Sequence, residues 1–377
     1  MHTLVTIVTV MNLSVCGGVK TGRLLGLDGS IGDGLIEIDI DTGESTFLFP
    51  FGVNPSAGAL AVAPDGTLYA AFVGDVDRLF IVDPDAEEVT PVGFFGFEDV
   101  SGLAFAPDGT LYGVDRTSDQ LITIDPLTGE GTAVGIVVRS GNGLTFTPDG
   151  TLYLIGNPVG GARLYTVDPD TAEATEVGLF GSDLIGASGL AAIGDVLYAD
   201  AYQPIWPFEG MVTLDRETGE ATVVGDYCPH KDCHSANGLA FLPGPGDADR
   251  DGDVDHDDFD IFVSCFTGPD PGDELPVGCL FLDTDDDGDI DCDDWIEFIA
   301  AWTEEEDPPS FPKCEPCAGD VNGDDMVDPL DSGFVLARFG CPVGEGDPDC
   351  DIADQNGDNA VDPLDIGFVL ARFGPCD

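Results

Sequence analysis

The stretch Gly58-Ala-Leu-Ala-Val-Ala-Pro-Asp-Gly-Thr-Leu-Tyr69 recurs along the first part of this 377-residue chain. Close copies run from Gly102 to Tyr112 (GLAFAPDGTLY) and from Gly143 to Tyr153 (GLTFTPDGTLY), and looser copies begin at Gly189 and Gly238. Successive copies start 44, 41, 46 and 49 residues apart. Each Pro-Asp-Gly favours a tight turn between two alternating strands. With a second pair of strands after each copy, this period predicts an array of four-stranded units.

The two ends of the array are incomplete in complementary ways. It begins at Arg23 with a second strand that no first strand precedes, and it ends at Gly238 to Leu242 with a first strand that no second strand follows. If the last strand completes the first unit, the sheets close into a ring without exposed strand edges. The sequence therefore predicts a mainly β chain with a five-bladed β-propeller over residues 23–245. The alternatives are an open stack of β-meanders and a longer propeller that lacks its first blade.

The repeated turn and strands resemble those of bacterial β-propellers with YVTN-like or NHL-like repeats. The resemblance covers roughly Arg23 to Leu242. Propellers of this kind include hydrolases, lyases, lectins and scaffolds, so the resemblance implies an architecture and leaves the activity open.

Small polar residues stand at the ends of the first and second strands of several repeats. The first strand of a blade lines the central channel, so these residues are candidates for a ring at one mouth that binds a cation or a small polar ligand. They are Ser101, Asn142, Ser188, Asn237, Asp115 and Asp200. The alternative is that they only satisfy strand ends. The four histidines do not recur in the repeats and no G-x-S-x-G motif occurs, so no catalytic set emerges.

A 12-residue acidic frame occurs four times after Gly246. Oxygen-bearing side chains at positions 1, 3, 5, 9 and 12, with the backbone carbonyl of position 7, can wrap around one hard cation, which predicts up to four calcium ions. Position 6 is Gly, Asp or Asn, which tolerate an unusual backbone, and position 8 is always β-branched, as expected where paired loops join through a short strand. The candidate ligands are Asp247, Asp249, Asp251, Asp253, Asp255 and Asp258; Asp283, Asp285, Asp287, Asp289, Asp291 and Asp294; Asp320, Asn322, Asp324, Met326, Asp328 and Asp331; and Asp354, Asn356, Asp358, Ala360, Asp362 and Asp365.

Apolar residues at helical spacing follow each frame. Together with Asp320-Val-Asn-Gly-Asp and with Asp at position 12, this pattern resembles type I dockerin repeats, which dock onto cohesin domains in extracellular assemblies. The resemblance implies two small α-helical, EF-hand-like modules at residues 246–303 and 318–376, joined by a linker at residues 304–317, and a cohesin-like partner. Positions 10 and 11 of the first frame are His256 and Asp257, where cohesin recognition often uses Ser and Thr.

The chain carries 73 acidic and 12 basic residues, a formal net charge of −61. Such a charge excludes nucleic acid and anionic membranes as partners, because both would be repelled. Eight of the 11 cysteines follow Gly246, which predicts an extracellular or cell-surface protein with disulfides. No apolar run reaches the roughly 20 residues of a transmembrane helix.

Two segments outside the repeats leave alternatives open. Residues 1–22 are a signal segment, a truncated or misassigned N-terminus, or a first strand. Cys228 and Cys233 are expected to close a local loop as a disulfide, whereas zinc held by these cysteines with His230 and His234 is the alternative.

These patterns predict an exported calcium-binding modular protein. The propeller serves as a binding or scaffold domain, with a polysaccharide or a small polar molecule as its ligand, and the tail attaches it to a protein partner or to the cell surface. The competing hypothesis is an extracellular polysaccharide hydrolase or lyase with its active site on the propeller. That activity requires acidic residues from different blades to converge in one pocket.

Overall fold

The computed structural model divides the chain into two compact units, Met1–Pro308 and Pro309–Asp377. It describes residues 21–28, 34–52, 57–73, 77–138, 141–181, 184–203, 208–227, 236–268, 275–284, 287–303, 308, 311, 326–327, 329–339, 353, 360–370 and 374–375.

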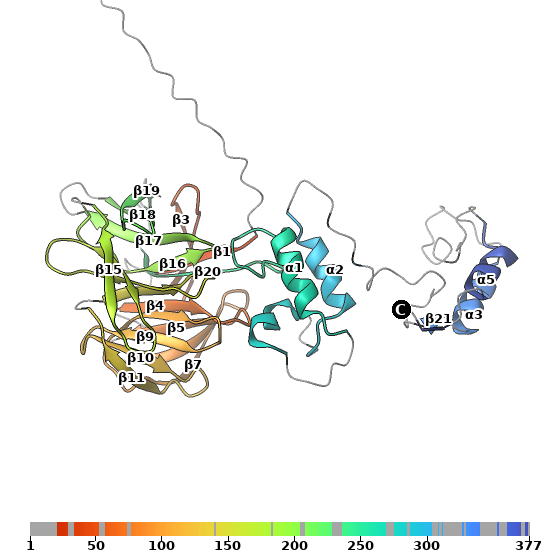
Figure 1. Ribbon diagram of the computed structural model, residues 1–377, viewed down its shortest axis with the longest axis horizontal. Coiled ribbons are helices and arrows are strands. Elements are labelled where there is room, and N and C mark those ends of the chain that lie inside the picture. The colour runs from red at the N-terminus through yellow and green to blue at the C-terminus, as the bar shows by residue number, and fades with distance from the viewer. Residues whose placement is uncertain are drawn as a thin grey trace, which may run out of the picture. The chain divides into compact units, whose positions relative to one another are not determined.

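Five four-stranded antiparallel sheets form the described part of the propeller (Figure 1). The first blade consists of β20 (Ala236–Leu242), β1 (Arg23–Asp28), β2 (Gly34–Ile38) and β3 (Ser45–Pro50). The other blades are β4 (Ala57–Val62), β5 (Leu68–Val73), β6 (Arg78–Asp83) and β7 (Glu88–Phe94); β8 (Val100–Phe105), β9 (Leu111–Asp115), β10 (Gln120–Ile124) and β11 (Gly131–Ile136); β12 (Gly141–Phe146), β13 (Leu152–Gly156), β14 (Arg163–Val167) and β15 (Ala174–Leu179); and β16 (Leu190–Ile193), β17 (Val196–Gln203), β18 (Phe208–Leu214) and β19 (Ala221–Asp226). The five-bladed propeller predicted from the repeats is confirmed.

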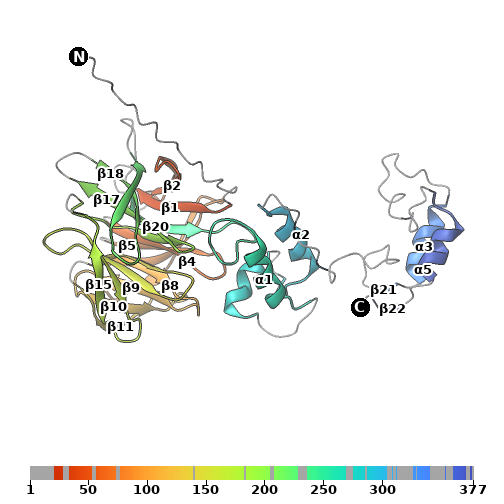
Figure 2. The same ribbon diagram turned by 45° about the horizontal axis from the view of Figure 1, so that its top comes forward.

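The last strand closes the ring by completing the first blade. β20 pairs antiparallel with β1, with Arg23 opposite Leu242 and Leu25 opposite Ala240. The adjacent positions of β1 and β20 are visible in Figure 2. This pairing excludes the open stack of meanders, because the incomplete strands at the two ends of the array form one sheet.

A hydrophobic cluster fills the space between each pair of neighbouring blades among the described residues. The cluster that joins the last blade to the first contains Ala191 and Met211 from one side and Leu24, Ile36 and Ile38 from the other. Because successive side chains of a strand point to opposite faces, the apolar residues of one blade pack in the clusters on both of its sides.

Glycines of the fourth strands allow neighbouring blades to approach closely. A Cβ at any of these positions would lie against the backbone carbonyl oxygen of a threonine in a turn of the next blade. The pairs are Gly93 with Thr128, Gly135 with Thr171, Gly178 with Thr218, and Gly225 with Thr42. The last pair joins the fifth blade to the first, so it forms part of the ring closure.

The chain continues from β20 into module 1, which we define as residues 246–303. It contains α1 (His256–Cys265), the 3₁₀ helix η1 (Val277–Leu282) and α2 (Cys292–Ala300). Phe262, Trp295 and Phe298 are buried and pack with ring centroids 5.1 to 5.5 Å apart. The helices expected after the first two acidic frames are confirmed, and their aromatic faces form the core of the module.

The second unit repeats this pattern on a smaller described part. β21 (Met326–Val327) pairs with β22 (Gly374–Pro375), and α3 (Pro329–Ala337) and α5 (Pro363–Leu370) follow their acidic frames. Val335, Ala353, Val361 and Val369 form its buried cluster. No described helix in either unit has the length and apolar character needed to cross a membrane.

Candidate metal centre

The first acidic frame, loop 1 (residues 247–258), gathers carboxylates around a small volume. Oxygens of Asp247, Asp249 and Asp258 lie within 4.8 Å of one another, as do oxygens of Asp253, Asp255 and Asp258. Position 12 is therefore shared by both groups. A calcium loop draws its oxygens from positions 1, 3, 5, 7, 9 and 12. The structure brings positions 1, 3 and 12 into one group and positions 7, 9 and 12 into the other, whereas Asp251 at position 5 belongs to neither group.

Local hydrogen bonds explain why the loop adopts this shape. Asp258, with no exposed side-chain area, accepts hydrogen bonds from the backbone N–H of Ala248 (2.7 Å), Asp249 (3.1 Å) and Asp255 (2.8 Å). Asp255 is the N-cap of α1 and forms a capping box with Asp258. Gly252, at position 6, has a φ of +94°, the left-handed backbone predicted for that position. Position 12 thus ties the start of the loop to the start of the helix.

Asp247 is the exception among these satisfied carboxylates. It is completely buried, and its Oδ2 accepts a hydrogen bond from the backbone N–H of Gly252 (3.2 Å). Its Oδ1 is buried and accepts no hydrogen bond in the described part of the chain. A buried carboxylate oxygen without a donor is costly unless a cation compensates it, so Asp247 fits a metal ligand.

The electrostatics of loop 1 also favour a cation. Burial, together with the nearby charge of Asp258, raises the pKa of Asp247 to about 8. Burial likewise raises the pKa of Asp258 to about 7 and that of Asp249 to about 6. These carboxylates repel one another when ionised, and a bound divalent cation would reverse that cost.

The second frame, loop 2 (residues 283–294), repeats the group at positions 7, 9 and 12, whereas Asp283 and Asp287 at positions 1 and 5 are not part of it. Oxygens of Asp289, Asp291 and Asp294 lie within 4.8 Å of one another. Asp291 is the N-cap of α2, and Asp294 accepts hydrogen bonds from the backbone N–H groups of Asp291 (2.9 Å) and Thr284 (2.6 Å). Burial raises the pKa of both Asp283 and Asp291. Asp285, at position 3, lies outside the described residues.

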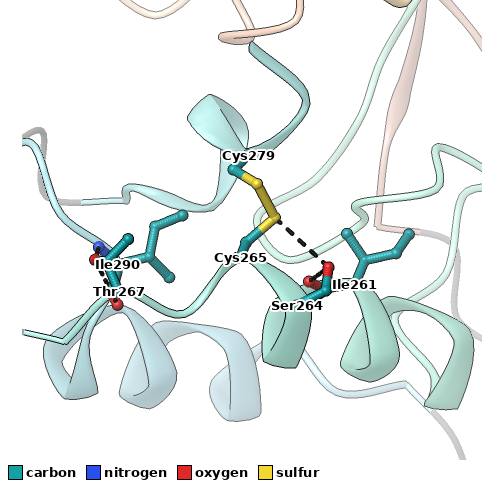
Figure 3. Close-up of a disulfide and its surroundings, with 6 residues drawn as sticks. All are labelled: Ile261, Ser264, Cys265, Thr267, Cys279 and Ile290. Atoms are coloured by element: carbon teal, nitrogen blue, oxygen red, sulfur yellow. Dashed lines mark hydrogen bonds between the residues drawn. A yellow bond between two sulfur atoms is a disulfide. The ribbon is translucent and has the colours of Figure 1, made fainter. Parts of the chain in front are cut away.

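Position 8 of each loop pairs across module 1 instead of with the other loop. Val254 N donates to Thr303 Oγ1 (2.9 Å) and Thr303 N donates to Val254 O (3.0 Å). Ile290 N donates to Thr267 Oγ1 and Thr267 N donates to Ile290 O, both at 2.9 Å (Figure 3). At these positions, two pairs of hydrogen bonds replace the short strand expected between the two loops. Position 8 of each loop bonds to the threonine that follows the helix of the other loop.

A disulfide links α1 to η1 near the hydrogen bonds between Thr267 and Ile290. Cys265 and Cys279 are bonded at 2.05 Å and stand 14 residues apart in sequence (Figure 3). Disulfides were predicted for this part of the chain from its cysteine content. The cross-link limits the freedom of the segment between the two loops in the unfolded chain.

The third and fourth frames are described only in part. Asp320, Asn322, Asp324, Asp328, Asp354, Asn356 and Asp358 lie outside the described residues. Met326 stands in β21, Asp331 in α3, Asp365 in α5, and Ala360 just before Val361 and Asp362. Asp362 Oδ1 accepts the backbone N–H of Leu364 (2.7 Å), as Asp255 Oδ1 accepts that of Asp257 (2.7 Å). The helix start after loop 4 therefore matches that of loop 1.

The polar residues proposed for the channel mouth form hydrogen bonds between blades. Ser101 Oγ donates to Gly141 O (3.0 Å) and Asn142 Nδ2 donates to Ala187 O (3.1 Å). Ser188 Oγ donates to Asn237 Oδ1 (3.5 Å) and to Asp200 Oδ2 (2.8 Å).

The two carboxylates of this set are also held by the protein. Asp200 further accepts the backbone N–H groups of Ser188 and Gly189, and Asp115 accepts those of Asp99 (2.9 Å) and Ser118 (2.8 Å). Burial raises the pKa of Asp200 to about 6. All six residues thus have protein partners, and ligand binding by this ring stays a prediction. Residues 1–20 and the Cys228, His230, Cys233 and His234 set lie outside the described residues.

Arg250, at position 4 of loop 1, is a residue that the calcium frame did not single out. Its φ is +62°, its Nη2 donates to Ala63 O at the end of β4 (3.0 Å), and its backbone O accepts from Gly194 N (2.8 Å). Thr21 N also donates to Gly252 O (3.0 Å). Loop 1 is therefore packed against the propeller. The only signal in the sequence is a single basic residue in the run Asp-Ala-Asp-Arg-Asp-Gly.

A cavity of about 330 Å³ lies between the propeller and module 1. One leucine from the first strand of each blade lines it: Leu60, Leu103, Leu144, Leu190 and Leu239. The residues two positions later also line it: Val62, Phe105, Phe146, Ala192 and Phe241. Module 1 contributes Ala248, Asp249, Arg250, Ile261, Gly278 and Phe281. The same leucines also border the part of the central channel that the glycines of the first strands line. No space for a water molecule remains there, so the cavity ends at this point.

No protein-family model matches the sequence, and no curated protein matches it. Among solved structures, a chain of the Kuenenia stuttgartiensis hydrazine synthase is 20% identical with a TM-score of 0.34, covering 44% of this chain and 47% of that one. A chain of a nidogen/laminin complex is 12% identical with a TM-score of 0.44, covering 59% and 98%. Regucalcin, a calcium-binding protein from Agrobacterium tumefaciens strain C58, is 19% identical with a TM-score of 0.35, covering 48% and 64%. This chain thus spans about half the length of the hydrazine synthase chain, and likenesses of this size carry no inference about function.

Proposed function

We propose that this chain is an exported calcium-binding protein whose propeller is a binding or scaffold domain and whose dockerin-like tail attaches it to an extracellular protein partner or to the cell surface. The observation that carries the calcium part is Asp247. Its buried Oδ1 accepts no hydrogen bond within the described residues, while the neighbouring carboxylates converge on the same volume.

Calcium suits this donor set better than other biological cations. The ligands are carboxylates and backbone carbonyls on alternate residues of a flexible 12-residue loop, which suits a hard cation with six to eight oxygen ligands. Soft metals prefer thiolate and imidazole ligands, and the described residues of loops 1 and 2 that converge are all aspartates. The high acidity of the chain also suits an exterior rich in divalent cations.

Calorimetric titration of the full chain with calcium, with magnesium as the comparison, tests the calcium proposal. Extracellular calcium modules bind at roughly 10⁻⁴ to 10⁻³ M, and that range or a tighter one is expected. Asp247→Asn removes the charge of the buried ligand and should weaken one site by about tenfold or more.

Asp108→Asn is the matched control for that variant. Asp108 is a propeller turn residue whose Oδ1 accepts Thr110 N (2.9 Å), so the same change outside the loops should leave the titration unaltered. If Asp247→Asn bound calcium as the unmodified chain does, loop 1 would not be the site.

The attachment part has its own test. An immobilised type I cohesin should retain the full chain with calcium and release it with a chelator. A chain that binds calcium without being retained would remove cohesin as the partner and leave the calcium site standing.

The competing polysaccharide hydrolase or lyase needs two acidic groups in one pocket. Among the described residues that line the 330 Å³ cavity, Asp249 is the single carboxylate, and it comes from loop 1 instead of from a blade. The cavity thus provides no observation that favours this alternative.

A further inference from the structure

Arg250 combines features that a structural anchor alone does not require. A guanidinium carries five N–H donors. Among the described residues, Arg250 uses one of them, on Ala63 O, while it lines the cavity. It is also the single basic residue of the described lining. Arg250 therefore retains N–H donors for an acidic oxygen that enters the cavity.

Burial makes this cation unusually ready for such a partner. Arg250 is half-buried where it lines the cavity. A guanidinium that has lost much of its water gains more from a charge-assisted hydrogen bond than an exposed one does.

The rest of the cavity is apolar. Leucines from all five blades, together with Phe105, Phe146 and Phe241, supply a surface that favours rings or methylene groups. The volume of about 330 Å³ falls at the lower end of the range for small-molecule sites, which combine an apolar lining with a few polar groups. The volume and the lining chemistry suit one small molecule.

We propose that this cavity binds a small amphiphilic carboxylate, with its apolar body against the leucines of the five blades and its carboxylate on the guanidinium of Arg250. The proposal rests on the proposed binding role of the propeller and specifies its ligand. Loop 1, α1 and η1 of module 1 line the side of the site that faces the propeller, so the complete site exists only while module 1 is packed on the propeller.

One blade offers a direct way to fill the site. Ala192 is opposite Leu197 as Phe105 is opposite Leu111 and Phe146 is opposite Leu152, so the three occupy equivalent positions of their blades. Ala192→Phe gives the fifth blade the residue that other blades carry there, and the variant is expected to fold. The added phenyl ring would occupy part of the cavity.

The experiment is equilibrium dialysis of the calcium-loaded full chain with benzoate, 2-naphthoate and decanoate. At least one should bind saturably at one site per chain, and the corresponding uncharged carboxamide should bind about tenfold more weakly or worse, because it cannot accept a charge-assisted pair of hydrogen bonds. Arg250→Met should reduce carboxylate binding to the carboxamide level.

Two further variants separate a ligand site from an anchor. Ala192→Phe should abolish binding without lowering the melting temperature, whereas Arg116→Met, a change at an exposed arginine paired with Asp99 outside the cavity, should leave binding intact. Absence of binding by all three carboxylates, or equal binding in the Ala192→Phe variant, would overturn the proposal. Calcium titration of the same samples shows separately whether the calcium sites are present.

Discussion

The propeller and loop 1 both contain a buried aspartate, Asp200 and Asp247, and the two differ in their hydrogen-bond partners. In the propeller, Asp200 accepts hydrogen bonds from Ser188 N, Ser188 Oγ and Gly189 N, so its oxygens are satisfied by the chain itself. In loop 1, Asp247 has one oxygen held by Gly252 N and one without a donor in the described residues. Burial raises the pKa of both groups, to about 6 and about 8. Asp200 and Asp247 therefore differ in their hydrogen-bond partners and in the convergence of neighbouring carboxylates, more than in their burial.

Substitutions in loop 1 should change stability the most. Asp258→Ala removes the acceptor of three part-buried backbone N–H groups, which should destabilise module 1 by on the order of 4 kcal/mol. The variant should also lose the stabilisation that calcium gives. Denaturant unfolding followed by circular dichroism, with calcium and with chelator, measures both effects.

Asp257→Ala, at the exposed neighbouring position, is the control for Asp258→Ala and should change the stability by no more than about 0.5 kcal/mol. If Asp258→Ala kept the calcium-dependent stabilisation of the unmodified chain, position 12 would be structural only, and the contrast between the two regions would fail.

A smaller effect is expected at the ring closure of the propeller. Gly225→Ala would place a Cβ against the Thr42 carbonyl oxygen of the first blade and should cost about 3 kcal/mol. Because no loop 1 residue takes part, the loss should be the same with calcium and with chelator, as measured by propeller unfolding. Gly333→Ala in α3, where a Cβ meets nothing within 4 Å, should leave propeller unfolding unchanged. A loss in the Gly225 variant that calcium reversed would show that the two regions are not independent.

The smallest effect concerns pH. Asp200 has a pKa raised from 3.8 to about 6, so the folded chain binds its proton more tightly than the unfolded chain does. The stability from this group is therefore fully present below about pH 4 and is lost as the pH rises to about 6, a change on the order of 2 kcal/mol. Asp200→Asn should remove this slope. Unfolding free energies of both proteins from pH 4 to 7 test it, because the loop carboxylates cancel in the difference; parallel curves would contradict the assigned burial.

The sequence allowed the propeller and the acidic frames to be predicted because both depend on local repetition. The Pro-Asp-Gly turns and the alternating strands specify a blade, and complementary ends at Arg23 and Gly238 specify closure. Gly252 could be predicted in the same way, since position 6 needs its backbone freedom. The turns, the strands and the acidic frames are each set within about 45 residues of chain, and closure follows from counting the strands at the two ends of the array.

Contacts between distant segments could not be predicted from that repetition. The exchange of Val254 with Thr303 and of Ile290 with Thr267 depends on how two helices pack, and no period in the sequence encodes it. Arg250 reaches Ala63, 187 residues away in the chain. The cavity is also invisible in sequence, because its lining comes from all five blades and from module 1.

The pairing of β1 with β20 has a mechanical consequence. Arg23 and Leu242 lie opposite each other, so the chain enters β1 and leaves β20 at the same end of the pair. A pulling force between the start of β1 and the end of β20 would therefore act on the hydrogen bonds between these strands one after another. The hydrogen bond from Thr21 N to Gly252 O spans the two strands just beyond that end, and Arg250 ties the same loop to Ala63. Under such a force, these two contacts of loop 1 would bear load together with the first hydrogen bonds between β1 and β20.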